Sequence, residues 1–88
     1  MTQKNDIDNL RETIDTIDKE ILNLLQERLQ CAVKIGHYKE SVNKAKRDPE
    51  REQQIYERIL QENNKVFPEK PLKEIYEKII ETCFLAQK

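Results

Sequence analysis

Apolar residues recur along the first half of the chain with the spacing of one helix face. Counted in sevens, one column is broken only by an arginine and reads Ile7, Ile14, Ile21, Arg28, Ile35 and Val42. The column three residues further on reads Leu10, Ile17, Leu24, Cys31 and Tyr38. Two apolar columns at a/d spacing predict one long helix with a buried seam. We expect it over about residues 6–45, with Asp6 or Asp8 as its capping residue.

Two shorter helices are predicted after this one. Asp48-Pro49 places a capping aspartate before a proline at the first helical position, so the second helix is expected over about residues 49–64. Asparagines and prolines then mark a connection, and the third helix is expected over about residues 70–87. Its apolar positions are Leu72, Ile75, Tyr76, Ile79, Ile80, Cys83 and Phe84. No strand pattern is visible, which predicts one all-α domain over residues 1–88.

The length of the first helix predicts an assembly. A helix of about 38 residues spans about 57 Å, whereas a compact chain of 88 residues has a diameter of about 30 Å. The helix therefore projects beyond its own globule with its apolar seam uncovered. Because an exposed seam needs a partner, we expect an intertwined homodimer with paired long helices.

Composition narrows the classes of function. Charged residues make up 38% of the chain, yet the net charge is −1, which gives little support to nucleic-acid or membrane-surface binding. No apolar run reaches the ~20 residues of a membrane span, and the segment MTQKNDIDNL has no signal-peptide core, so we expect a cytoplasmic protein. One histidine and no CxxC pair predict no metal site. Cys31 and Cys83 lie on apolar stripes and are expected to be buried and unbridged.

Several polar residues fall on stripes that should be buried. Arg28 keeps its charge at any physiological pH, so in a seam it must be paired or must face a ligand. Arg11 and Lys39 flank the same seam, Glu52 is in register with the apolar stripe of the second helix, and Gln87 with that of the third. Inward-facing cations favour a binding site for an anion.

Structural explanations exist for the same residues. A charged seam residue often sets the register of paired helices, and Arg28 with Glu52 would form an internal ion pair. Gly36 is expected to permit close packing with another helix. Taken singly, the arginines of the second-helix region are expected to be solvated surface: Arg47, Arg51 and Arg58.

Three segments together resemble one known family. They are LRETIDTIDKEILNLLQERLQCAVKIGHYK, RDPERE and IIETCFLAQ. In their combined spacing the chain resembles the all-helical (AroQ) chorismate mutases over about residues 6–88. The resemblance implies an intertwined homodimer of three-helix protomers that rearranges chorismate to prephenate without a cofactor.

The resemblance also implies roles for individual residues. Arg28 would bind one carboxylate of chorismate, and Arg11 would reach the other carboxylate from the partner chain. Lys39 would bind the ether oxygen and a carboxylate, and Gln87 would be the second donor to that oxygen.

The remaining implied roles concern the ring and the walls of the pocket. Glu52 and the backbone around Asp48 would hold the ring hydroxyl, with Arg51 in support. Apolar walls would come from Ile35 and Ile80. One position departs from the family: Cys83 stands where well-known members carry a serine that hydrogen-bonds a carboxylate. Since a thiol is a weaker donor, somewhat weaker substrate binding is expected there, not loss of activity.

Other functions remain compatible with the sequence. A lyase that eliminates pyruvate from isochorismate uses the same scaffold and a similar polar set. A non-catalytic helical dimerisation or regulatory module would instead pair the inward polar groups with each other and leave no cavity. The family also occurs as the N-terminal part of fusions with other enzymes of aromatic biosynthesis, so a free-standing enzyme and an excised domain are both open.

Overall fold

The computed structural model describes residues 5–41 and 47–87 and is entirely α-helical in its regular structure there. Its helices are α1 (Asp6–Ser41), α2 (Pro49–Asn63) and α3 (Glu69–Leu85). The predicted three-helix, all-α fold is therefore confirmed. The expected end of the first helix, near residue 45, lies outside the described residues.

The cap of α1 differs from the prediction. The Asp8 backbone N–H donates to Oδ1 of Asn5 at 2.8 Å, so Asn5 is the capping residue and neither Asp6 nor Asp8 fills that role. The physical reason is positional, because a cap must precede the first helical residue to reach the free N–H groups of the first turn. Asp6 and Asp8 lie inside that turn, where their negative charge suits the helix dipole.

Side-chain hydrogen bonds fix both ends of α2. Oδ1 of Asp48 accepts from the Arg51 backbone N–H at 3.1 Å, so Asp48 caps the helix and Pro49 takes its first position. At the other end Asn64 adopts the left-handed conformation, with φ of 50°. The Asn63 amide then accepts from the Phe67 N–H and donates to the Phe67 carbonyl. These bonds close the turn that sends α3 back along α2.

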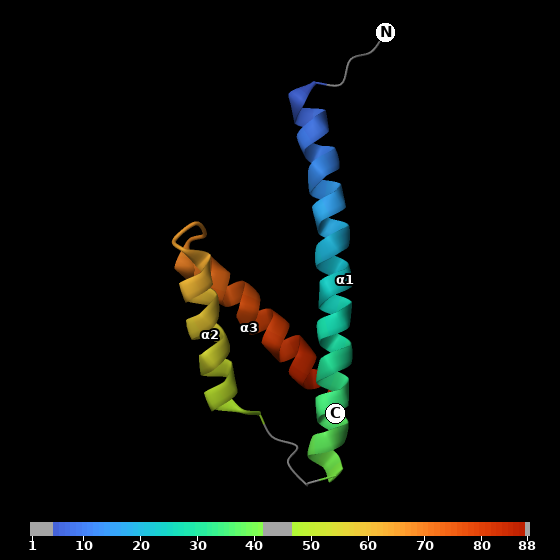
Figure 1. Cartoon of the computed structure of the whole chain (residues 1–88), viewed down its shortest axis with the longest axis vertical. Helices are drawn as coiled ribbons and strands as arrows, with labels where there is room; N and C mark the ends of the chain where they lie inside the picture. The colour runs from blue at the N-terminus through green and yellow to red at the C-terminus, as the bar shows by residue number, and fades with distance from the viewer. Residues whose placement is uncertain (1–4, 42–46, 88) are drawn as a thin grey trace.

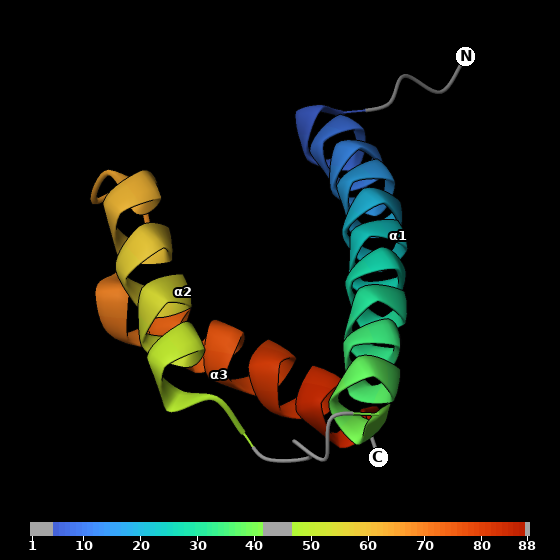
Figure 2. The ribbon, with the colours of Figure 1, turned by 60° about the horizontal axis from the view of Figure 1, so that its bottom comes forward.

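The three helices form an elongated, open shape, in which α3 packs against both α2 and the C-terminal half of α1 (Figures 1 and 2). The chain extends 64 Å along its longest axis and 15 Å along its shortest. Its radius of gyration is 17.4 Å, well above the roughly 12 Å of a compact chain of this length. The buried side chains lie where the helices meet, and they are Ala32, Ile55, Ile80 and Cys83.

The N-terminal half of α1 stands clear of the other helices and leaves its seam uncovered (Figure 1). Six seam residues are each between 47% and 63% exposed: Ile7, Leu10, Ile14, Ile17, Ile21 and Leu24. Cys31 is exposed as well, so the expectation that both thiols are buried is wrong for Cys31 in the single chain. Among residues 5–41 and 47–87, no other element covers that part of the seam. Cys83 is buried, and both thiols are free.

Candidate functional site

A cavity of about 270 Å³ opens where α1, the start of α2 and the end of α3 approach one another. Nine of the ten residues that the sequence singled out line it: Arg28, Ile35, Lys39, Asp48, Arg51, Glu52, Ile80, Cys83 and Gln87. Arg11 is absent from the lining and lies about 25 Å from Arg28 along α1, as expected from the helical rise. The cavity therefore gathers nine of the predicted residues of this chain from around three separate helices.

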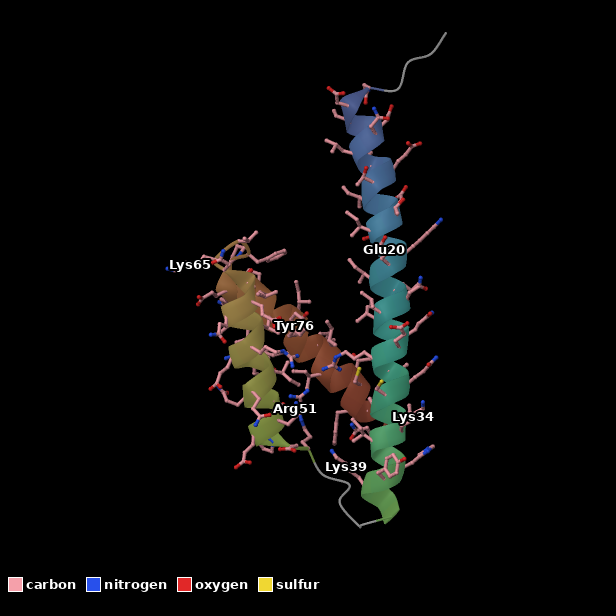
Figure 3. All side chains as sticks on the ribbon, viewed as in Figure 1. Glu20, Lys34, Lys39, Arg51, Lys65 and Tyr76 are labelled. Atoms are coloured by element: carbon pink, nitrogen blue, oxygen red, sulfur yellow. The ribbon has the colours of Figure 1, made fainter. Side chains whose placement is uncertain are left out.

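Helix α1 supplies two cations to the cavity, Arg28 and Lys39. They are eleven residues apart, almost three full turns, so they lie on nearly the same face about 16 Å apart along the axis. Figure 3 shows Lys39 on the side of α1 that faces the other helices, whereas Lys34 points away from them. Nζ of Lys39 donates to Oε1 of Gln87 at 3.3 Å, which joins α1 to the end of α3.

The start of α2 and its cap supply two carboxylates, Asp48 and Glu52, and one arginine, Arg51, to the cavity, and Arg58 follows two turns further along the helix. The Asp48 carboxylate is engaged as the helix cap. Both oxygens of Glu52 accept from Arg47, one from Nε at 2.9 Å and the other from Nη2 at 2.8 Å. The hydrogen bond to Glu52, together with its charge, raises the pKa of Arg47 above its ordinary value. The alternative in which Glu52 pairs with Arg28 is not seen in the described part of the chain, where Arg47 is the ion-pair partner of Glu52.

Helix α3 supplies the apolar floor and one amide. Ile80 and Cys83 are each only 6% exposed, and Gln87 follows Cys83 by one turn. Gly36 of α1 is buried against the backbone of Gln87, so the expected close packing at this glycine is confirmed. This contact sets the position along α1 at which the Gln87 amide lies.

The electrostatics of the cavity favour an anion. Its lining contains four cations, which are Arg28, Lys39, Arg51 and Arg58, against two carboxylates. Both carboxylates are already engaged, whereas the guanidinium groups of Arg28, Arg51 and Arg58 have no hydrogen bond or ion pair within residues 5–41 and 47–87. An excess of two positive charges in a half-enclosed space suits a small molecule with two carboxylates.

The cavity is also lined by five residues that the sequence analysis did not assign to the site: Cys31, Ala32, Ile55, Arg58 and Phe84. Arg58 was expected to be solvated surface, and it is exposed as expected, but it also borders the cavity. The signal was present in the sequence, because Arg51, Ile55 and Arg58 are spaced by four and three residues and share one helix face. Arg47 is exposed as expected, and it also forms an ion pair with Glu52 and places its guanidinium 5.5 Å from the centre of the Phe84 ring.

The described part of the chain shows neither a metal site nor a membrane-spanning helix. Its His, Cys, Asp and Glu side chains form no group of three suited to a metal ion. None of its helices is long and apolar enough to cross a lipid bilayer.

Comparison with known proteins agrees with this arrangement. The family model for chorismate mutase type II matches residues 10–88, which contain all three helices almost in full. The chain belongs to this family. No solved structure matches it significantly.

Curated relatives of this chorismate mutase type II domain are mostly longer proteins. The bifunctional chorismate mutase/prephenate dehydratase of Aquifex aeolicus is 42% identical over 87 residues, which is 94% of this chain and 24% of that protein. The Escherichia coli K12 protein of the same name is 38% identical over 60 residues, 68% of this chain and 16% of that protein. The chorismate mutase of Methanocaldococcus jannaschii is 42% identical over 50 residues, 57% of this chain and half of that protein. This chain spans about a quarter of the length of the first bifunctional relatives.

Proposed function

We propose that this chain is a chorismate mutase, which converts chorismate to prephenate in the biosynthesis of phenylalanine and tyrosine. The observation that carries the proposal is the cavity, where guanidinium groups from two helices, without partners in the described part of the chain, line a space suited to a dicarboxylate. Membership of the family supports the same reaction. A location in the cytoplasm stays a prediction.

The reaction is an intramolecular rearrangement and requires no nucleophile and no proton transfer. The protein must hold a flexible substrate in the chair-like conformer from which the new bond forms. Arg28 binds one carboxylate of that conformer, and Arg51 lies across the cavity on α2 to support the ring (Figure 3). Ile35 and Ile80 supply apolar contact, and Glu52 with the Asp48 backbone holds the ring hydroxyl. Cys83 faces a carboxylate as a weak donor.

Charge stabilisation at the ether oxygen accounts for the rest of the acceleration. As the C–O bond breaks, negative charge grows on this oxygen, and preorganised donors lower the barrier most at such a place. The Lys39 ammonium has three N–H donors, of which one is used by Oε1 of Gln87. That bond turns the oxygen of the Gln87 amide toward Lys39 and leaves its NH₂ group for the substrate. Lys39 and Gln87 then both donate to the ether oxygen.

The site is completed by a second copy of the chain. The exposed seam of α1 needs a cover, and a partner α1 lying antiparallel would both cover it and carry its own Arg11 toward this cavity. Arg11 lies too far along α1 to reach the cavity of its own protomer. In this proposal Arg11 of the partner binds the second carboxylate of chorismate.

Two other functions would have different consequences for the cavity or for the reaction product. A non-catalytic module would pair its inward polar groups and leave no cavity, whereas Arg28 is unpaired within the described residues and a cavity remains beside it. A pyruvate lyase acting on isochorismate would use a similar set of cations. The two enzymes differ in their substrate and in their product, because only the lyase releases pyruvate.

The deciding experiment is to incubate the purified chain with chorismate and to follow the product by absorbance and NMR. Prephenate should form well above the uncatalysed rate. Arg28→Ala and Lys39→Ala should each lower kcat/KM at least about a hundredfold, as loss of a charged donor to a developing anion does. Lys34→Ala, on the outer face of α1, is the matched control (Figure 3). Turnover near wild type in both site variants would contradict the assignment, and pyruvate from isochorismate without prephenate from chorismate would favour the lyase.

A further inference from the structure

Arg47 does not line the cavity, yet it contacts two residues that do. Its guanidinium group forms a two-point ion pair with Glu52 and lies over the Phe84 ring at 5.5 Å. Glu52 belongs to α2 and Phe84 to α3, so one side chain joins the walls of the cavity from outside it. The Glu52 side chain is 20% exposed, and Arg47 is 47% exposed.

The ion pair between Arg47 and Glu52 matters because of the other charges that line the cavity. Glu52 shares the lining with Arg28, Arg51 and Arg58, whose guanidinium groups have no partner in the described part of the chain. A carboxylate released next to free guanidinium groups would pair with one of them. Such a pair would neutralise a cation that the substrate's carboxylates require.

We propose that Arg47 is a positioning residue that holds Glu52 back from the cations of the cavity. The proposal rests on the function proposed above. A carboxylate has about four lone-pair positions, and Arg47 uses one on each oxygen. Glu52 therefore remains able to accept a hydrogen bond from the substrate's ring hydroxyl while its charge is balanced from outside. The contact with Phe84 fixes the plane of the guanidinium group.

Kinetics of single and double variants test whether Arg47 acts through Glu52. Arg47→Gln should raise KM for chorismate about tenfold and change kcat much less, because the freed Glu52 competes with the substrate for a cation. Adding Glu52→Gln removes the competing charge, so the double variant should bind chorismate better than Arg47→Gln alone. A purely structural role of Arg47 predicts no such rescue.

The matched control is Lys73→Gln, which removes a similar cation–aromatic contact, 5.4 Å from the Tyr56 ring, outside the cavity. Its KM should equal that of the wild type. Circular dichroism and thermal melting of every variant separate a binding defect from unfolding. An unchanged KM in a folded Arg47→Gln variant, or a defect that persists undiminished in the double variant, would overturn the proposal.

A second readout does not depend on turnover. In the ¹⁵N-labelled chain without substrate, Arg47→Gln should shift the side-chain N–H resonance of an arginine in the cavity, and Glu52→Gln should reverse that shift. Absence of any shift would refute the role of Arg47 even if the chain is a mutase. Conversely, a wild-type chain that leaves chorismate unchanged but shows the shift would refute the proposed function alone.

Discussion

Gly36 and Gln87 approach so closely that no side chain fits between them. A Cβ atom built on Gly36 would lie 2.5 Å from the carbonyl oxygen of Gln87 and 2.8 Å from its Cα. The obstacle is backbone rather than the end of a flexible side chain, so an added methyl group must push away the turn that follows α3. The same turn carries the amide that receives the hydrogen bond from Lys39.

Gly36→Ala is therefore expected to damage the site although it favours the helix. Alanine in place of a mid-helix glycine gains about 1 kcal/mol of helix propensity. Displacement of Gln87 would remove the donor proposed above for the ether oxygen, and kcat should fall about tenfold or more. Steady-state kinetics and thermal melting measure the two effects, with Gln30→Ala on the exposed face of α1 as the control. Wild-type kcat in Gly36→Ala would show that the position of Gln87 is not critical.

Cys83→Ser tests the one departure from the family pattern. Cys83 is 6% exposed in the floor of the cavity, and a hydroxyl is a stronger hydrogen-bond donor than a thiol. We expect KM for chorismate to fall severalfold. The free energy of unfolding without substrate should also fall by about 1 kcal/mol, because the buried hydroxyl lacks a partner until a ligand binds. Cys83→Ala, which has no donor, should show a KM no lower than that of the wild type; equal KM values in all three would exclude a contact with the substrate.

Arg58→Gln tests a cation that the structure adds to the site. Arg58 lies two turns beyond Arg51 on the same face of α2, about 10 Å further along the helix. At that distance it acts on the approaching dianion through its field, so its loss should raise KM severalfold and leave kcat nearly unchanged. The difference from wild type should shrink as salt screens the field. Arg58→Lys keeps the charge and serves as the control, and a fall in kcat instead would indicate direct contact with the reacting substrate.

Periodicity made most of the fold and part of the candidate site predictable, and the family resemblance supplied the other candidate site residues. The heptad columns located α1 and identified Arg28 as an anomaly, and Asp48-Pro49 marked the start of α2. Periodicity could not predict side-chain contacts between residues that come together only when the chain folds. Arg47 lies before α2 and follows no helical stripe, so its contacts with Glu52 and Phe84 appear only once the chain is folded.

Two errors have equally specific causes. The cap of α1 was misplaced because three polar residues, Asn5, Asp6 and Asp8, lie within one turn, and only the exact start of the helix decides among them. Cys31 was expected to be buried because the seam pattern does not say which chain covers it. Within the described residues of a single chain, nothing covers that part of α1.

Mixed dimers test whether Arg11 enters the site of the partner. Arg11→Ala and Arg28→Ala should each be nearly inactive alone, because every site then lacks one cation. If Arg11 acts across the interface, a mixed dimer of the two variants contains one site with both arginines and one with neither. Random mixing makes half of the dimers mixed, so activity should return to about a quarter of the wild-type value.

The control for this mixing experiment pairs Arg28→Ala with Lys39→Ala. Both residues line the cavity of one protomer, so every site of a mixed dimer lacks one of them and activity should stay low. Native mass spectrometry shows whether mixed dimers have formed. If they have, and the mixture of Arg11→Ala with Arg28→Ala also stays inactive, Arg11 lies outside the partner's site. Recovery in the first mixture alone would establish that each site draws cations from two chains, because no arrangement within one protomer produces that difference.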